Sequence, residues 1–185
     1  MIYNIIGMKN IECEERVMIS FDQYTVLVAA YVAKDPHFRL LEIENTYLDD
    51  ENLSLKNKHH VLRIRKTNNE YELTLKIKGD NGDIEINETP DNHPEIDRYL
   101  NNQFDLYKPI TSLKTRRIEA KIDDYLVVID MNKYNGIIDY DLEVEASNME
   151  RAKEVMANIC QEYKLEYKKD YISKSSRAFN TRRKN

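Results

Sequence analysis

Charged side chains recur at every second position in three segments whose other residues are typical of β-strands. They are Glu12, Glu14 and Arg16 in the first segment, Arg63 and Arg65 in the second, and Glu143 and Glu145 in the third. Because successive side chains of a strand point to opposite faces of its sheet, the charges of each segment share one face. Like charges that lie close together in an interior are costly unless opposite charges or metal ions compensate them. We therefore expect this face to be a functional site rather than a device that stabilises the fold.

Alternation of polar and apolar residues predicts eight strands, interrupted by a few helical stretches. We expect the strands at about 9–19, 40–48, 61–66, 71–78, 83–89, 112–122, 125–132 and 136–146. Helical spacing predicts helices from the N-cap Ser20 to the residues before Asp35, at 94–104 and at 148–163, with a short helical turn through 50–58. The predicted fold class is α+β. It is a closed antiparallel eight-stranded β-barrel with flanking helices, because closure removes exposed strand edges.

The length of 185 residues fits one domain. We expect a single domain over 1–185, with a folded core at 8–177 and flexible ends at 1–7 and 178–185. The pattern leaves the oligomeric state open, a dimer included.

The composition limits the cellular compartments and the kinds of partner that we expect for this protein. A charged fraction of 33% with a net charge of -5 indicates a mildly acidic soluble protein and argues against nucleic acid as the main partner. Cys13 and Cys160 lack metal-type spacing, and no secretory leader is recognisable, which favours a reducing, cytoplasmic location. No apolar run approaches the roughly 20 residues of a membrane helix, so we expect no membrane partner.

The two signs of charge are sorted among the predicted strands. Acids gather on the first and eighth strands, and bases gather on the third and fourth. If these faces simply met water, charges of both signs would be scattered. Carboxylate oxygens suit Mg²⁺ or Mn²⁺, and arginine side chains match phosphate oxygens with paired hydrogen bonds. The sorting therefore predicts an interior that binds a polyanion together with its metal.

Seven motifs in chain order resemble those of the CYTH superfamily, also called triphosphate tunnel metalloenzymes. The resemblance covers about 8–177 and is strongest through the order of the motifs, since each one alone is weak. The motifs are Glu12-Cys13-Glu14-Glu15-Arg16, Arg63-Ile64-Arg65, Leu75-Lys76-Ile77-Lys78-Gly79, Glu85, Lys114-Thr115-Arg116, Asp130 and Leu142-Glu143-Val144-Glu145.

The resemblance implies a hydrophilic tunnel that holds a triphosphate, with a divalent metal on the glutamates. The members most similar in size are small bacterial proteins related to thiamine triphosphatase and class IV adenylyl cyclase. Known activities of the family are hydrolysis of tripolyphosphate, thiamine triphosphate and RNA 5′-triphosphate, and cyclisation of ATP. In one departure, Arg16 stands where the family has lysine, and arginine is neither deprotonated nor a compact point charge.

From the charges and the resemblance together we assign a role to each candidate. The phosphate-binding candidates are Arg63, Arg65, Lys76, Lys78, Arg116, Lys174 and Arg177, and the metal candidates are Glu12, Glu14, Glu143 and Glu145. The candidates for catalysis are Glu12, Glu14, Arg16, Glu85 and Asp130.

Local detail of the sequence bears on three points. Arg116 competes with Arg117 for the inward position, and the family phrase favours Arg116. Lys174 and Arg177 are expected to close one mouth of the tunnel over the terminal phosphate. His59 and its neighbour His60 are expected on the surface, since adjacent side chains of an extended segment diverge.

The resulting expectation is a Mg²⁺- or Mn²⁺-dependent triphosphatase acting on tripolyphosphate or a small organic triphosphate. Two alternatives remain. One is a class IV-type adenylyl cyclase, for which we find no sequence signature of a base pocket. The other is a non-catalytic protein that binds polyphosphate or nucleotides, which the Arg16 substitution supports.

Overall fold

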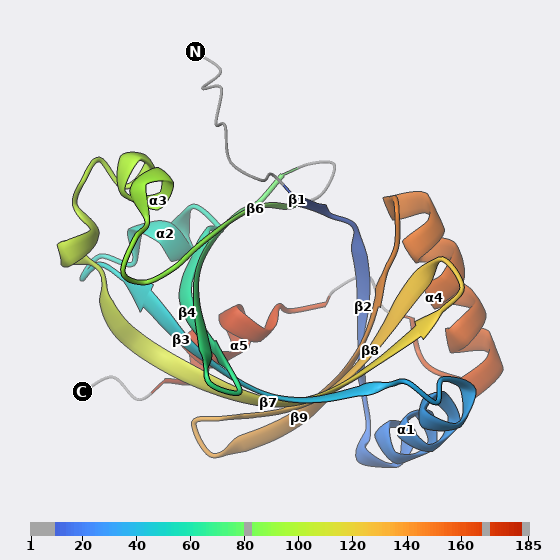
Figure 1. Ribbon diagram of the computed structural model, residues 1–185. Coiled ribbons are helices and arrows are strands. Elements are labelled where there is room, and N and C mark those ends of the chain that lie inside the picture. The colour runs from blue at the N-terminus through green and yellow to red at the C-terminus, as the bar shows by residue number, and fades with distance from the viewer. Residues whose placement is uncertain (1–9, 80–82, 168–170, 183–185) are drawn as a thin grey trace.

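The computed structural model describes residues 10–79, 83–167 and 171–182, and the side chains from residue 13 onward. One curved antiparallel sheet dominates these residues, and Figure 1 shows it curling around a central space. The strands are β1 (Asn10–Glu12), β2 (Glu14–Ile19), β3 (Arg39–Asp49), β4 (Val61–Thr67), β5 (Glu70–Ile77), β6 (Asp83–Glu88), β7 (Lys108–Ile122), β8 (Tyr125–Tyr134) and β9 (Ile137–Glu145).

The strand order of the described sheet is β1-β6-β5-β4-β3-β7-β8-β9-β2. The predicted α+β class with flanking helices is confirmed, but closure of the sheet by hydrogen bonds is not observed, since no ladder joins β1 to β2. The expected first strand, 9–19, changes partner at Cys13: Glu12 lies opposite Asp83 on β6, and Glu14 lies opposite Glu145 on β9. The chain itself therefore runs across the gap between the two ends of the sheet.

Two-residue turns set the register of the hairpins. Asn135 and Gly136 join Tyr134 to Ile137 on the neighbouring strand, and both turn residues have positive φ, at 49° and 82°. Positive φ at both central positions is the geometry of the hairpin turn that Asn-Gly favours. Asp123-Asp124 and Asn68-Asn69 also connect their strands with two residues, in the β7/β8 and β4/β5 hairpins, but only the first residue of each turn has positive φ.

Helices cover the outer face of the sheet and one helix lies within its curve (Figure 1). Ser20 and Gln23 form a capping box at the start of the first helix, as the sequence predicts for this N-cap. The helix expected at 94–104 ends earlier, because Asn101 and Asn102 adopt positive φ, and a short 3-10 turn, Phe104–Leu106, follows. The helices are α1 (Phe21–Lys34), α2 (Ser54–Asn57), α3 (Pro94–Tyr99), α4 (Met149–Tyr163) and α5 (Lys174–Thr181).

Apolar side chains pack outward from the sheet against these helices. Leu142 and Val144 of β9 belong to a core shared with Leu27 of α1 and Met156 of α4. A second core lies beneath α2 and α3 and includes Leu73 and Leu75 of β5. The helices thus take up the apolar faces of the strands, and the polar faces are left to line the interior.

The helix α5 was not predicted as a helix. Its Ala178 and Phe179 are buried against Tyr47 of β3, Leu113 of β7 and Tyr134 of β8. Because this contact involves the inner face of the sheet, α5 fills part of the space that the strands surround.

None of the described helices is both long enough and apolar enough to cross a membrane.

Candidate active site

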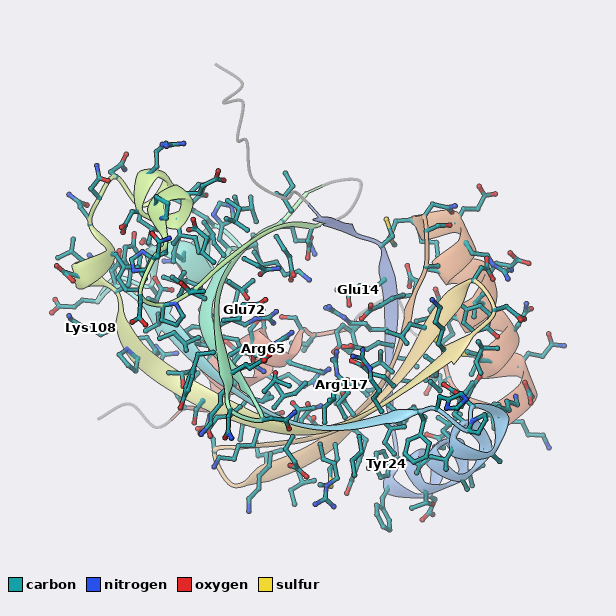
Figure 2. The ribbon with its side chains drawn as sticks, viewed as in Figure 1. Glu14, Tyr24, Arg65, Glu72, Lys108 and Arg117 are labelled. Atoms are coloured by element: carbon teal, nitrogen blue, oxygen red, sulfur yellow. The ribbon has the colours of Figure 1, made fainter. Side chains whose placement is uncertain are left out.

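A cavity of about 430 Å³ lies on the inner face of the sheet. Figure 2 shows Glu14, Arg65 and Arg117 pointing into the enclosed space, whereas Tyr24 and Lys108 lie outside it. Charged side chains reach the cavity from α2, β2, β4, β5 and the residue just past it, β6, β7, β9 and α5. They are Glu14, Arg16, Lys56, Arg63, Arg65, Lys76, Lys78, Asp83, Glu85, Arg117, Glu143, Glu145 and Lys174.

Three glutamates form an acidic wall of this cavity, which we define as Glu14, Glu143 and Glu145. Each offers one carboxylate oxygen, and these oxygens lie within 4.8 Å of one another. The antiparallel register explains the gathering, since Glu14 lies opposite Glu145 and Arg16 opposite Glu143. Closely grouped carboxylate oxygens are the ligand set that Mg²⁺ and Mn²⁺ prefer, so the acidic wall fits such an ion. The side chain of Glu12, the fourth predicted ligand, lies outside the described residues.

Basic side chains compensate the acidic wall. Glu14 accepts from Lys76 Nζ at 3.1 Å and from Arg16, whose Nε lies 3.1 Å from Glu143 Oε1. Glu143 also accepts from Lys174 Nζ at 2.8 Å and from Arg117 Nη2 at 3.0 Å. Burial opposes ionisation of Glu143, but Lys174, Arg16 and Arg117 hold the pKa of its carboxyl well below the ordinary value. The buried acid is therefore a carboxylate at neutral pH.

Arg63 and Arg65 of β4 form a second region, the arginine wall. Within the described part of the chain, Arg65 makes no ion pair and donates from Nε to Asn45 Oδ1 at 3.1 Å. Arg63 Nη2 lies 3.6 Å from Glu85 Oε1, and its Nε is buried with no hydrogen-bond partner among the described residues. Burial, together with the charges of Arg63 and Arg117, lowers the pKa of Arg65 to about 10. Arg65 is still charged at neutral pH, so this wall holds positive charge that the described carboxylates do not match.

Lys76, on β5, and Lys78, just past its end, differ in their surroundings. Lys76 Nζ lies 3.5 Å from both Asp83 and Glu85, besides its contact with Glu14. Lys78, one residue past the end of β5, lines the cavity but is exposed at its mouth. Glu85 therefore serves to hold the cations Arg63 and Lys76 in place.

The expectation that Arg116 faces the interior is wrong. The Arg116 side chain is 53% exposed and pairs with Glu42 on the outer face, at 2.8 Å. Arg117 lines the cavity instead, is 13% exposed and binds both oxygens of Asp130, at 3.0 and 2.8 Å. The sequence holds a signal for this, because the Asp123-Asp124 turn sets Arg117 opposite Asp130, and opposed residues share a face.

Asp130 lies behind the residues that line the cavity. Asp130 is fully buried beneath Arg117 and Lys174, which both donate to it. Asp130 therefore anchors cations, and its position does not support the catalytic role expected from the sequence.

Arg177 does not line the cavity either, contrary to the expected phosphate contact. It pairs with Asp139 at 2.9 Å and with Asp141 at 2.6 Å. Both aspartates are shielded from solvent: Asp141 is fully buried, and Asp139 is 12% exposed at its side chain. Arg177 thus fixes α5 to β9, which sets the position of Lys174 at the start of the same helix.

The sequence does not assign several residues that line the cavity, among them His59, His60 and Tyr171. His59 and His60 line the mouth, although His60 also binds Tyr99 through Nδ1 at 2.7 Å. Tyr171 lines the interior, and its hydroxyl is buried without a hydrogen-bond partner among the described residues. No strand or motif precedes Tyr171 that could have indicated its place. Its free hydroxyl is a donor that a bound phosphate or water can use.

The CYTH domain family matches residues 10–178, which is most of the chain. The protein belongs to the CYTH domain family. This CYTH protein is 28% identical over 170 residues to the Bacillus subtilis (strain 168) protein named "Putative triphosphatase YjbK", covering 85% of this chain and 88% of the relative.

Solved structures share the fold. A "putative adenylate cyclase" from Bacillus halodurans superposes with a TM-score of 0.81 at 24% identity, over 92% of this chain and 98% of that one. HpAC1 from Hippeastrum, described as a putative adenylyl cyclase with a dominant triphosphatase activity, gives a TM-score of 0.74 at 18% identity. The second match covers 94% of this chain and 96% of that one. At these identities the likeness concerns the fold alone.

Proposed function

We propose that this CYTH protein is a divalent-metal-dependent triphosphatase that hydrolyses inorganic tripolyphosphate or a small organic triphosphate. The observation that carries the proposal is the presence of the acidic wall and the arginine wall in one cavity. Membership of the CYTH family, the triphosphatase name of the Bacillus subtilis relative and the reported activity of the Hippeastrum protein support it.

The cations of the cavity bind the phosphate oxygens in this proposal. Arg63 and Arg65 offer planar donor groups that match phosphate with two hydrogen bonds each. Arg117 stands between the two walls, held by Asp130, and extends the cationic surface toward Glu143. Lys76 and Lys78 add charge along β5 toward the mouth.

The acidic wall holds the Mg²⁺ or Mn²⁺, with Glu12 as the further ligand proposed from the sequence. Such an ion, when bound, neutralises charge on the phosphate oxygens and lowers the pKa of a coordinated water. Among the described residues, Glu14, Glu143 and Glu145 are the carboxylates that present grouped oxygens to the cavity.

Hydrolysis requires little covalent chemistry from the side chains. Water oxygen attacks a terminal phosphorus, the bridging P–O bond breaks, and the leaving diphosphate keeps the bonding electron pair. The terminal phosphorus leaves as orthophosphate, and the surplus proton of the water passes to solvent. Positioning and charge stabilisation supply most of the catalysis of such a transfer. Arg63, Arg65 and Arg117 hold the chain of phosphates in line, and Tyr171 supplies a neutral donor beside Glu143.

Phosphate release decides between this activity and the two alternatives. The purified protein is incubated with tripolyphosphate, ATP and thiamine triphosphate, first with Mg²⁺ and then with Mn²⁺. We expect phosphate from at least one substrate, and none when a chelator removes the metal. Cyclic AMP from ATP identifies a cyclase, and tight binding without release identifies a binding protein.

A binding protein without turnover is the second candidate because of one contact. Arg16, in place of the family lysine, binds Glu14 and lies 3.1 Å from Glu143 Oε1. An arginine here retains the charge of lysine but cannot give up a proton. If the lysine of other members does more than bind phosphate, this chain binds the triphosphate and leaves it intact.

A further inference from the structure

The acidic wall contains internal cations where the proposed function places a metal ion. Lys174 is the one that comes from outside the sheet, as the first residue of α5. Its Nζ donates to Glu143 Oε1 at 2.8 Å and to Asp130, and its side chain is 14% exposed. The ammonium group therefore occupies the electrostatic place of a bound cation next to a carboxylate of the candidate metal site.

Helix α5 is held in place, but the ammonium group of Lys174 can rotate at the end of its side chain. Arg177, one turn further along α5, is bound to Asp139 and Asp141, and Phe179 is buried against Tyr47. A lysine carries its charge on a flexible four-carbon chain with three rotatable donors. The ammonium group can therefore turn to another anion in the cavity while α5 stays in place.

The arginine wall carries positive charge in the same cavity that is not fully matched by described carboxylates. Within the described part of the chain, Arg65 has no ion pair and Arg63 Nε lacks a hydrogen-bond partner. A polyanion bound there brings acceptor oxygens into the cavity that Lys174 also lines. The ammonium group can then exchange a carboxylate partner for a phosphate partner.

We infer that Lys174 is an internal counter-ion of the metal site, which a bound triphosphate draws away from Glu143. Divalent metal and triphosphate then bind cooperatively, because each removes an obstacle to the other. This inference rests on the proposed metal site but does not require turnover. Such coupling is reciprocal for the two binding equilibria, and a factor of about 5–150 in affinity is typical.

The first experiment measures Mn²⁺ binding without any phosphate, by the electron paramagnetic resonance signal of free Mn²⁺. Lys174→Met keeps most of the side-chain volume and removes the charge. We expect it to bind Mn²⁺ at least about fivefold more tightly than the wild type does. A loss of binding, or an unchanged affinity, overturns the inference.

Lys56→Met is the matched control. Lys56 also lines the cavity, but its Nζ donates to Asn180 Oδ1 at 2.9 Å and contacts no carboxylate of the acidic wall. We expect its Mn²⁺ affinity to stay within about twofold of the wild type. If both variants gain affinity equally, the cause is the general charge of the cavity and the specific role of Lys174 is overturned.

The second experiment adds a triphosphate analogue whose bridging oxygens are replaced by imido groups, so that it is not hydrolysed. After correction for Mn²⁺ held by the analogue in solution, it should raise the Mn²⁺ affinity of the wild type, and should raise that of Lys174→Met clearly less. Equal gains in the two proteins contradict the exchange of partners.

Two further readouts separate the causes of failure. Circular dichroism checks that Lys174→Met is folded, and Lys174→Gln repeats the test with a polar neutral side chain if it is not. Absence of Mn²⁺ binding in every protein overturns the metal site and this inference together. Absence of hydrolysis with the expected binding pattern overturns only the triphosphatase proposal.

Discussion

The acidic wall and the arginine wall share one cavity but differ in how their charges are matched. Glu143 of the acidic wall contacts three cations, Lys174, Arg16 and Arg117. Arg65 of the arginine wall, in the part of the chain that the structure describes, has only the amide oxygen of Asn45. Glu143 is compensated from within, whereas Arg65 is left for an anion from outside.

This difference indicates which ligands the cavity is suited to bind. Arg65, which pairs with no described carboxylate, lies near the charges of Arg63 and Arg117 and costs stability in the ligand-free protein, because like charges repel where water is scarce. A polyanion removes that cost, and a metal ion can replace the internal cations of the acidic wall. Metal and polyanion are therefore expected to satisfy the two walls together better than either does alone.

Removal of a metal-site charge should have the largest effect. Glu143→Gln takes a ligand charge from the acidic wall while keeping side-chain size, and we expect phosphate release to fall by about 10³-fold, since metal contributes several kcal/mol to transition-state stabilisation. Glu42→Gln on the outer face is the control and should keep the wild-type rate. Wild-type kinetics for Glu143→Gln would remove this residue from the site.

The adjacent arginines of β7 give the next test. Arg117→Met removes a cation between the two walls, and we expect kcat/KM to fall about 10²-fold, as for the loss of one charged transition-state contact. Arg116→Met removes the same group from the outer face and should change kcat/KM less than twofold. Equal losses would mean that the assignment of inner and outer faces of β7 is wrong.

Tyr171 should contribute less to kcat/KM than Arg117 does. Tyr171→Phe removes only the buried hydroxyl, and the loss of one hydrogen bond to a charged group predicts a drop of about tenfold in kcat/KM. The thermal midpoint of the ligand-free protein should not fall, since the hydroxyl has no protein partner in the described structure. Lower stability with unchanged kinetics would assign Tyr171 to packing.

The smallest expected effect is a gain in stability. Arg65→Met removes an unmatched charge beside Arg63 and Arg117, so we expect the thermal midpoint of the ligand-free protein to rise by about 2–4 °C, which corresponds to about 1 kcal/mol. Tripolyphosphate should stabilise this variant less than the wild type. A fall in the midpoint would show that Arg65 supports the fold rather than the ligand.

Much of this arrangement could be predicted from local rules. Alternation puts Arg63, Arg65 and Glu143 on one face of their strands, and the structure places all three on the cavity lining. The Asn135-Gly136 turn makes its hairpin recognisable, because few residue types tolerate positive φ at both central positions.

What could not be predicted depends on contacts between distant parts of the chain. The change of strand partner at Cys13 follows from the curvature of the whole sheet, which no local pattern records. The burial of Asp141 requires Arg177, 36 residues later, on a helix whose inward packing was not foreseen. Arg117 is a different case, since the two-residue turn at Asp123-Asp124 sets it opposite Asp130, and this register alone indicates that the two side chains share a face.

A crystal structure with Mn²⁺ and the imido triphosphate analogue tests the central claim most directly. We predict an anomalous peak in contact with Glu14, Glu143 and Glu145, and phosphate groups bound by Arg63 and Arg65. Mn²⁺ bound away from the acidic wall, or an analogue bound only outside the cavity, would contradict the account.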